Sequence, residues 1–578
     1  MKEEDYLKIR EVIEKIGEKT VNIYNAIPPK GNPGIKGAVL IMLCLAVSIP
    51  VVYNMRNNEN PSGDSNISTE TEATSASISE RITSGDASQT DITTESTDFT
   101  QHVPVTHEIS TQDVEIVVEA EDGEFAGNIK ADTARGGYSG SGYVNGFAAK
   151  STDDKLTLTV NIPVSQHYDI TVTYASEVPS RNYVFFNGCI KDLIIDDSNK
   201  GSFISKTTYG IYMEAGENKI SVLPSDANID VDKFTIKNNH MVYDTKFEIG
   251  GTLSNPSASP EAQKLMSILT SSFGKTIITG QAVSNEKNLE INTIKKITGK
   301  LPAMRFGDLG GYSLAETKEI DASLDWASQG GIAGLMWHWP APVGTPDVYS
   351  MNTDFNLANA VTDKDIALMS AEELQTMYDN GEISLECISL IKDIDKTSQQ
   401  LARLRDANVP VLWRPLHEAN GDWFWWSSSG PDAYKWLWQL MYRRQTEYHN
   451  LNNLIWVWCG QSAEYLVPEN TYDIASIDIY RQSYDANPEN FLEQYLRLYA
   501  ITGKKKLIAL SETGDLPDVD IMLRDRAMWS YFAAWYGNYV FDDDGNYIEE
   551  AGLKKEKLIK MYNCEASMTL DEYIALNS

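Results

Sequence analysis

The sequence predicts a multidomain α/β protein in which a (β/α)8 barrel of the TIM type follows an all-β jelly-roll or β-sandwich domain. Two patterns predict these domains. From residue 259 onwards, apolar runs alternate with helical stretches, whereas over 113–238 short β-rich runs recur between turn signals without a long helical pattern. A linker at 239–258 separates the two patterns. We therefore expect the sandwich at 113–238 and the barrel at 259–578.

Eight apolar runs are the predicted barrel strands. They lie at 276–278, 303–306, 332–336, 409–413, 454–458, 474–479, 507–510 and 535–540. The predicted helices include 260–272, 385–408, 432–450 and 487–502. In such a barrel the chemistry lies where strands end and the following loops begin. The residues at those ends are therefore the candidates for a functional site.

The apolar run at 37–53 predicts a single transmembrane anchor. Its length is at the short limit for a helix that spans a bilayer. Because Lys30 and Lys36 precede it, we expect a cytoplasmic tail at 1–36 and an extracellular remainder at the cell membrane. The alternative is a signal peptide cut near residues 46–48, which would give a secreted protein.

Residues 54–112 predict a disordered stalk. Between residues 61 and 100 the chain holds 18 Ser or Thr and eight acidic residues, but one Arg and one aromatic residue. Such a segment buries too little apolar surface to fold. A stalk between an anchor and folded domains indicates that the protein acts beyond the cell surface.

The formal net charge of −33 bears on the class of partner. A field of this sign repels nucleic acid and anionic lipid, whereas a neutral polymer meets no such repulsion. The cysteines have no spacing that indicates a zinc site or a disulfide framework. They are Cys44, Cys189, Cys387, Cys459 and Cys564. We expect a monomer with no nucleic-acid partner.

Two glutamates stand at facing strand ends of the predicted barrel. Glu418 follows the fourth strand and Glu512 follows the seventh, so their carboxyl groups are expected to meet across the barrel mouth. Carboxyl groups about 5–5.5 Å apart hydrolyse a glycoside with retention, since one attacks the anomeric carbon and the other protonates the leaving oxygen. The acid needs a raised pKa, for which Trp423 and His417 are suitable neighbours. The nucleophile must stay ionised, for which the hydroxyl of Tyr480 is a suitable donor.

Several neighbouring residues allow two interpretations. Asp308 and Asp478 are sugar ligands or partners of Arg414. Trp425 and Trp426 either contact sugar or pack inward, and the histidines of this region are ligands or satisfied core residues. Trp456 and Trp458 alternate along a strand and are predicted in the core.

Three motifs in the predicted barrel carry a resemblance to a known family. They are Trp-His-Trp-Pro-Ala-Pro at 337–342, Arg-Pro-Leu-His-Glu-Ala-Asn-Gly-Asp-Trp-Phe-Trp-Trp at 414–426 and Leu-Ser-Glu-Thr-Gly at 510–514. These motifs resemble glycoside hydrolase family 26, which is chiefly endo-β-1,4-mannanases. The resemblance implies that Glu418 is the acid/base and Glu512 the nucleophile. It implies substrate contacts by His338, His417, Trp423, Tyr480 and Trp535.

The implied activity is that of a retaining endo-1,4-β-mannanase that acts on β-mannan, galactomannan or glucomannan and needs no cofactor for catalysis. The long segment 341–384 after the third strand could reshape the cleft. Action on another β-glucan or β-xylan therefore stays open. A surface protein that binds glycans without cleaving them is the alternative from another class.

The sandwich carries a second resemblance. The stretches at 118–122, 137–147 and 228–236 resemble carbohydrate-binding modules of family 35 and its relative family 6. Those modules hold a structural calcium ion, which the match places on Glu119, Glu121 and Asp232. Hard oxygens suit calcium, although acids at strand ends are often merely solvated. Asn228 and Tyr143 are candidate sugar contacts.

Overall fold

A computed structural model describes residues 101–104, 112–195, 201–226, 228–310, 318–480, 491–542, 544–549 and 552–578. The predicted tail, the predicted anchor at 37–53 and nearly all of the predicted stalk lie outside the described residues. Within these ranges, no helix combines the length and the apolar character needed to cross a membrane.

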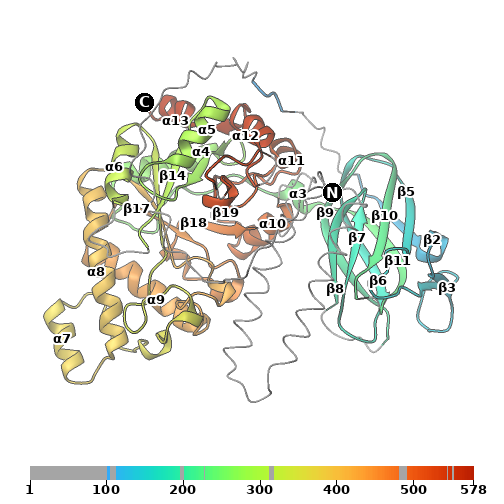
Figure 1. Ribbon diagram of the computed structural model, residues 1–578, viewed down its shortest axis with the longest axis horizontal. Coiled ribbons are helices and arrows are strands. Elements are labelled where there is room, and N and C mark those ends of the chain that lie inside the picture. Colours follow the sequence, from blue (N-terminus) through green and yellow to red (C-terminus); the bar gives the residue numbers. More distant parts are fainter. Residues whose placement is uncertain are drawn as a thin grey trace, which may run out of the picture. The chain divides into compact units, whose positions relative to one another are not determined.

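Two antiparallel sheets make up the sandwich (Figure 1). One sheet contains β3 (Lys130–Asp132), β4 (Tyr143–Asn145), β11 (Asp230–Asn238), β6 (Gln166–Ala175) and β9 (Ile204–Met213), and β1 (Glu115–Glu119) also pairs with β11. The other contains β2 (Glu124–Ala126), β5 (Lys155–Ile162), β10 (Gly216–Pro224), β7 (Ser180–Phe186) and β8 (Cys189–Ile195). Alternate residues of β5 are buried, so its apolar face packs into the core between the sheets.

Eight parallel strands close the barrel. In order they are β13 (Gly280–Ala282), β14 (Met304–Asp308), β15 (Ile332–Trp337), β16 (Val411–Pro415), β17 (Leu454–Trp458), β18 (Ile474–Ile479), β19 (Leu507–Thr513) and β20 (Phe532–Ala534). Their side chains are almost all buried, as expected for strands covered on both faces. The fold class predicted from the sequence is confirmed.

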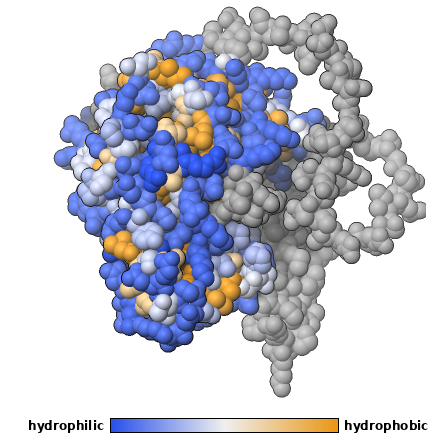
Figure 2. All heavy atoms as spheres, turned by 90° about the vertical axis from the view of Figure 1, so that its left-hand side faces the viewer, coloured by the Kyte–Doolittle hydropathy of each residue, from blue (hydrophilic) through white to orange (hydrophobic). Residues whose placement is uncertain are grey.

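Helices cover the outside of the barrel strands (Figure 1). The longer ones are α4 (Pro260–Ser272), α5 (Leu289–Thr298), α6 (Glu319–Ser328), α8 (Leu385–Asp406), α9 (Pro431–Arg443) and α10 (Leu492–Ile501). Shorter ones are α3 (Met241–Asp244), α7 (Ala371–Asp379), α11 (Val519–Arg524), α12 (Lys555–Tyr562) and α13 (Leu570–Asn577). The face in Figure 2 is mainly hydrophilic with small separate hydrophobic groups, which is typical of a surface that faces water.

Local signals explain why some helices begin where they were predicted. The Ser259 side chain accepts a hydrogen bond from the first turn of α4, and Pro260 supplies the fixed φ of a first helical residue. Ser384 caps α8 in the same way. The predicted helix at 432–450 is shorter than expected, since α9 ends at Arg443 and a π-helical turn (Arg444–Tyr448) follows.

The first and the eighth predicted barrel strands are wrong. Ile277 and Ile278 form β12, which pairs with β21 (Ser567–Met568) outside the barrel, while the barrel strand is the following β13. The eighth strand is β20, and residues 537–539 of the predicted strand form a 3-10 turn. Both true strands are only three residues long, so their apolar pattern is too short to stand out.

Candidate active site

The loop after β16 and the end of β19 bring Glu418 and Glu512 together. One carboxylate oxygen from each of Glu418, Glu512 and Asp478 lies within 4.8 Å of the others. This spacing suits double displacement, because inverting enzymes keep their carboxyl groups about 6.5–9.5 Å apart to admit a water molecule. The predicted meeting of the two glutamates across the barrel mouth is therefore present.

The backbone that presents Glu418 is strained. Leu416 and Glu418 both have left-handed φ, at 53° and 52°. Residues with a Cβ adopt this conformation at a cost, and such strain collects at functional sites. Gly421, in the turn that follows, lies beneath the Trp423 ring, and a Cβ there would come within 2.1 Å of that ring. A larger residue at this position would therefore displace the Trp423 indole.

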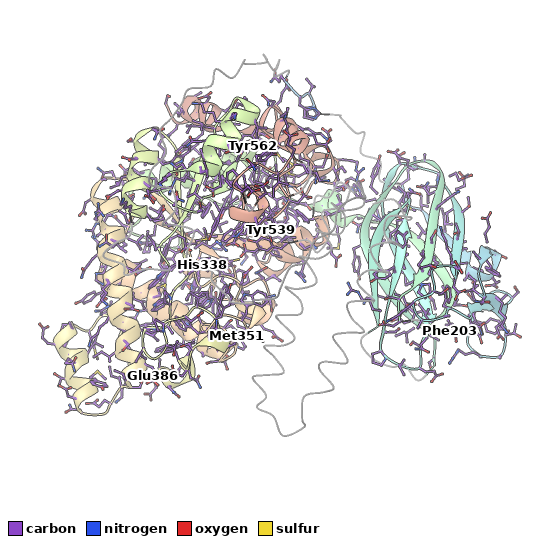
Figure 3. The ribbon with its side chains drawn as sticks, in the orientation of Figure 1. Phe203, His338, Met351, Glu386, Tyr539 and Tyr562 are labelled. Atoms are coloured by element: carbon purple, nitrogen blue, oxygen red, sulfur yellow. The ribbon has the colours of Figure 1, made fainter. Side chains whose placement is uncertain are left out.

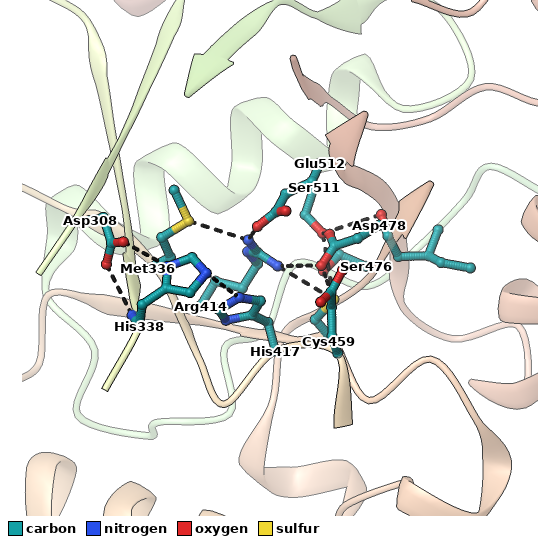
Figure 4. Close-up of polar contacts among 12 residues, drawn as sticks. Asp308, Met336, His338, Arg414, His417, Cys459, Ser476, Asp478, Ser511 and Glu512 are labelled. Atoms are coloured by element: carbon teal, nitrogen blue, oxygen red, sulfur yellow. Dashed lines mark hydrogen bonds and ion pairs between the residues drawn. The ribbon is translucent and has the colours of Figure 1, made fainter. Parts of the chain in front are cut away.

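A buried guanidinium lies between two of the three carboxylates (Figure 4). Arg414, from β16, is fully buried; its Nη1 donates to Asp478 at 2.8 Å and its Nη2 to Glu512. The Tyr480 hydroxyl donates to the other Glu512 oxygen at 2.6 Å. The open choice for Asp478 is thus resolved, since it is a partner of Arg414. The protein itself supplies the cation that balances this acidic cluster.

Asp478 is held by further contacts that the sequence did not reveal. Its carboxylate accepts a hydrogen bond from the Ser511 hydroxyl at 2.6 Å and one from the Cys459 thiol at 3.3 Å. The contact of Cys459 with Asp478 could not be predicted from the sequence, because it depends on the pairing of β17 with β18. These contacts fix the position of the Asp478 charge next to both glutamates.

Among the described residues, one group donates to Glu418: the indole N–H of Trp423, at 2.9 Å. Burial in the cleft raises the pKa of Glu418, and the negative charge of Asp478 raises it further. Burial and Asp478 also raise the pKa of Glu512, while Arg414 lowers it. Because Arg414 and Tyr480 both donate to Glu512, the anionic form belongs on Glu512 and the shared proton on Glu418.

The two predicted histidines form a chain with Asp308. His338 Nδ1 lies 2.6 Å from Asp308, and its Nε2 lies 3.1 Å from His417 Nε2. Burial would lower the pKa of His338, but the Asp308 carboxylate outweighs it and the pKa is raised. Burial and the charge of Arg414 lower the pKa of His417, so that ring is neutral. Asp308 thus orients His338 and is not a partner of Arg414.

The aromatic residues divide into core and cleft. Trp425 and Trp426 are fully buried, and their indole N–H groups donate to the carbonyls of Trp339 and His417. The inward-packing interpretation is therefore correct for both. Trp456 and Trp458 are fully buried as predicted. By contrast, Trp423 is 44% exposed, and Tyr480 is half-buried with its hydroxyl on Glu512. The half-buried Trp535 ring lies next to the rings of Tyr480 and His338.

The predicted metal ligands of the sandwich gather around one loop. The Ser139 hydroxyl donates to Glu119 at 2.6 Å, and the Ser139 N–H donates to Asp232 at 2.7 Å. One Glu121 oxygen accepts the Ser141 and Gly142 N–H groups, while the other is buried without a partner. A buried carboxylate oxygen without a partner, on a loop that also contacts two more acids, has the chemistry of a calcium ligand.

The candidate sugar contacts of the sandwich fare differently. Tyr143 is 3% exposed and packs against Phe203, so its predicted sugar contact is wrong. Its ring lies against Tyr138 as well as Phe203, and its hydroxyl accepts the Arg135 N–H at 3.2 Å. Asn228 is exposed, with a left-handed φ of 53°, and stays a candidate.

Comparisons with known proteins agree with this site. Residues 254–565 match glycosyl hydrolase family 26, and residues 116–239 match the carbohydrate binding module of family 35. The chain is 33% identical over 471 residues to a mannan endo-1,4-beta-mannosidase of Thermothelomyces thermophilus, with 78% of this chain and 89% of that protein covered. It is 32% identical over 487 residues to mannan endo-1,4-beta-mannosidase A of a Piromyces species, with 81% and 74% covered.

One solved structure is similar over most of this chain. It is the crystal structure of a GH26-CBM35 β-(1,4)-mannanase from Podospora anserina, with a TM-score of 0.53 and 31% identity. The match covers 81% of this chain and 100% of that chain. With two carboxyl groups at retaining distance and these matches, the chain belongs to glycosyl hydrolase family 26 and carries a family 35 carbohydrate-binding module ahead of its barrel.

Proposed function

We propose that the protein is a retaining endo-1,4-β-mannanase in which Glu512 is the nucleophile and Glu418 the acid/base. The observation that carries the proposal is the spacing of these two carboxyl groups, within 4.8 Å of each other and of Asp478. Relatives at 33% and 32% identity are named as mannan endo-1,4-beta-mannosidases, which supports mannan as the substrate.

In the first step, Glu512 attacks the anomeric carbon and the C–O bond to the leaving sugar breaks. Glu418 transfers its proton to the departing oxygen, so the leaving sugar departs as a neutral alcohol. Arg414 and Tyr480 hold Glu512 in the anionic form before attack. Burial and the charge of Asp478 keep the Glu418 pKa high enough for the proton to be present near neutral pH.

In the second step, water hydrolyses the glycosyl–enzyme ester. Glu418, now ionised, removes a proton from the water as it attacks the anomeric carbon, and Glu512 leaves as a carboxylate. Two inversions give net retention. As Glu512 regains its charge, the Arg414 and Tyr480 donors are already aimed at it.

The mechanism is tested by trapping the ester. A 2-deoxy-2-fluoro-β-mannosyl fluoride slows the second step, so the enzyme should gain one glycosyl group, found by peptide mass spectrometry on Glu512. Proton NMR of early products should show the β-anomer. Label on another residue, or an α-product, would refute the assignment.

The substrate is tested by comparing neutral polymers. Linear mannan and galactomannan should release a range of oligosaccharides from the first minutes, as endo attack requires. Barley β-glucan and β-xylan are the alternative substrates, and faster cleavage of either would replace mannan in the proposal. Binding of mannan without any release of oligosaccharides would support the non-hydrolytic alternative.

For the sandwich we propose a structural calcium ion held by Glu119, Glu121 and Asp232. Support comes from the orphaned Glu121 oxygen and from the contact of Ser139 with both other acids. The ion would stabilise the loop at 139–142 and takes no part in hydrolysis. The module would bind the polymer and raise its effective concentration at the barrel.

We also propose that the enzyme acts outside the cell. The apolar run at 37–53 and the Ser/Thr-rich stretch after it support export. Cell fractionation with N-terminal sequencing separates the two forms: an uncleaved chain in the membrane fraction indicates an anchor, and a shortened chain in the medium indicates a signal peptide. Activity confined to the cytoplasm would contradict both.

A further inference from the structure

The segment 345–352, here called the β15 arm, lies along the loop that carries Glu418. Tyr349 forms an antiparallel bridge with Phe424, the Ser350 N–H donates to the Trp423 carbonyl at 2.7 Å, and the Trp425 N–H donates to the Val348 carbonyl at 3.1 Å. The arm is therefore joined by backbone hydrogen bonds to the segment that positions the acid/base.

Side chains within the arm fix its shape. Asp347 accepts the Tyr349 N–H at 2.8 Å and the Asn352 amide at 3.2 Å. The Ser350 hydroxyl donates to the Asp422 carbonyl at 3.1 Å. A segment held in this way presents its side chains without a further ordering cost on binding.

The arm presents an aromatic ring to solvent. Tyr349 is 47% exposed, although one face of its ring stacks on Phe424 at 5.5 Å and 24°. Phe424 in turn stacks on the buried Trp426 at 4.4 Å. Met351, on the same arm, is also exposed and is labelled in Figure 3. One ring face is therefore anchored to the core while the rest of the ring is free for a ligand.

The contacts around Tyr349 indicate on which side of the cleft its ring lies, that of Glu418 or that of Glu512. Trp423, on the segment paired with the arm, donates to Glu418, whereas Tyr480 donates to Glu512. Partial burial and then the charges of Glu418, Asp347 and Glu512, in that order, raise the pKa of Tyr349. Tyr349 thus belongs with the acid/base, which faces the leaving oxygen, and not with the nucleophile.

We propose that Tyr349 is a specificity-determining residue that stacks on the sugar ring on the leaving-group side of the scissile bond. The inference rests on the proposed function, since it assumes that Glu418 is the acid/base. Flat aromatic rings suit the apolar face of a pyranose. With Tyr480 and Trp535 on the nucleophile side, the cleft then grips the chain on both sides of the bond, as endo attack requires.

The test compares a leaving group with a sugar ring and one without. Tyr349→Ala should lower kcat/KM on mannopentaose about 10-fold, the scale of one aromatic contact. On β-mannobiosyl fluoride, whose leaving group has no ring, the change should stay within about 2-fold. Tyr349→Phe keeps the ring and should resemble the wild type on both substrates.

The outcomes separate the two proposals. If the wild type cleaves neither substrate, the proposed function fails. If the wild type cleaves both, and Tyr349→Ala either loses both activities equally or loses neither, the role of Tyr349 fails. An equal loss in Tyr349→Phe would assign the effect to the hydroxyl and overturn stacking. Tyr209→Ala, which removes an equally exposed ring from β9 of the sandwich, controls for exposed tyrosine loss, and thermal unfolding checks the fold.

Discussion

The barrel brings three carboxylates within 4.8 Å of one another, whereas the sandwich places three acids around the loop at 139–142, and the two groups balance their negative charge differently. In the barrel, Arg414 is buried between Asp478 and Glu512. In the sandwich, the acids Glu119, Glu121 and Asp232 meet hydroxyl and backbone N–H donors, and among the described residues no Lys, Arg or His lies within ion-pair distance of them.

This difference fits two kinds of chemistry. In the barrel cluster, Arg414 supplies a fixed positive charge, and the remaining interactions decide which glutamate holds the proton. A cluster with neutral donors and an orphaned oxygen keeps a capacity for an added ion. Removal of one group from either cluster therefore tests whether the two differ in this way.

The largest effect is expected from Glu512→Ala. Without the nucleophile the ester cannot form, and kcat on mannan should fall at least about 10,000-fold. Added azide, which fits the space left by the side chain, should restore turnover of an activated aryl mannobioside and give a product of inverted configuration. Because the sandwich is untouched, binding of mannan in a pull-down assay should persist. Retained hydrolysis in this variant would remove Glu512 from the mechanism.

The next largest effect is expected from the removal of calcium. If the sandwich acids hold an ion at 100 times its Kd, chelation costs the sandwich about 2.7 kcal/mol of unfolding free energy. Scanning calorimetry should show its transition fall by several degrees with EDTA and return with added calcium. In Glu121→Gln the effect of EDTA should be smaller. Hydrolysis of mannopentaose should not change, and an unchanged transition would leave the cluster as a solvated group of acids.

The barrel and the sandwich also show which site residues can be predicted from the sequence. Glu418 and Glu512 could be predicted because each follows a strand with a long apolar run and carries a distinctive local motif. The placement of Asp478 beside Arg414 could not be chosen, since it depends on the register between β18 and β19. In the sandwich, the burial of Tyr143 could not be predicted, since it depends on contacts with Tyr138 and with Phe203, sixty positions along the chain.

Segments whose structure depends on pairing with distant residues were also hard to predict from the sequence. Strand β9 has no clear strand signal in the sequence, because most of its side chains are exposed or only partly buried and it lacks apolar alternation. The β15 arm had no signal at all: its ordering comes from pairing with residues 422–425, more than seventy positions away. Only the length of the segment 341–384 could be recognised from the sequence. Local patterns therefore located the catalytic glutamates, while the contacts that tune them required the structure.

Asp478→Asn should change the pH profile by removing a charge from the barrel cluster. The Asp478 charge raises the pKa of both glutamates, so its loss lowers both values. Glu418 must be protonated for the first step, and the basic limb of kcat/KM should therefore move to lower pH, with about 10-fold less activity at neutral pH. Cys459→Ser keeps a donor to Asp478 and should leave the limb in place. A limb that stays fixed in Asp478→Asn would mean that Asp478 does not set the Glu418 pKa.

The smallest effect is expected from Trp423→Phe. This variant should move the pH profile in the direction opposite to that of Asp478→Asn. The indole N–H stabilises the anionic form of Glu418 and lowers its pKa, so a phenyl ring that cannot donate should raise it. The basic limb of kcat/KM should move to higher pH, while kcat on mannopentaose changes about 3-fold, as expected for one hydrogen bond. Trp423→Ala removes the ring as well and should in addition raise KM, because the exposed indole faces the cleft. If Trp423→Phe and Asp478→Asn moved the limb in the same direction, the proton of the pair would not reside on Glu418, and the division of roles between the two glutamates would have to be reversed.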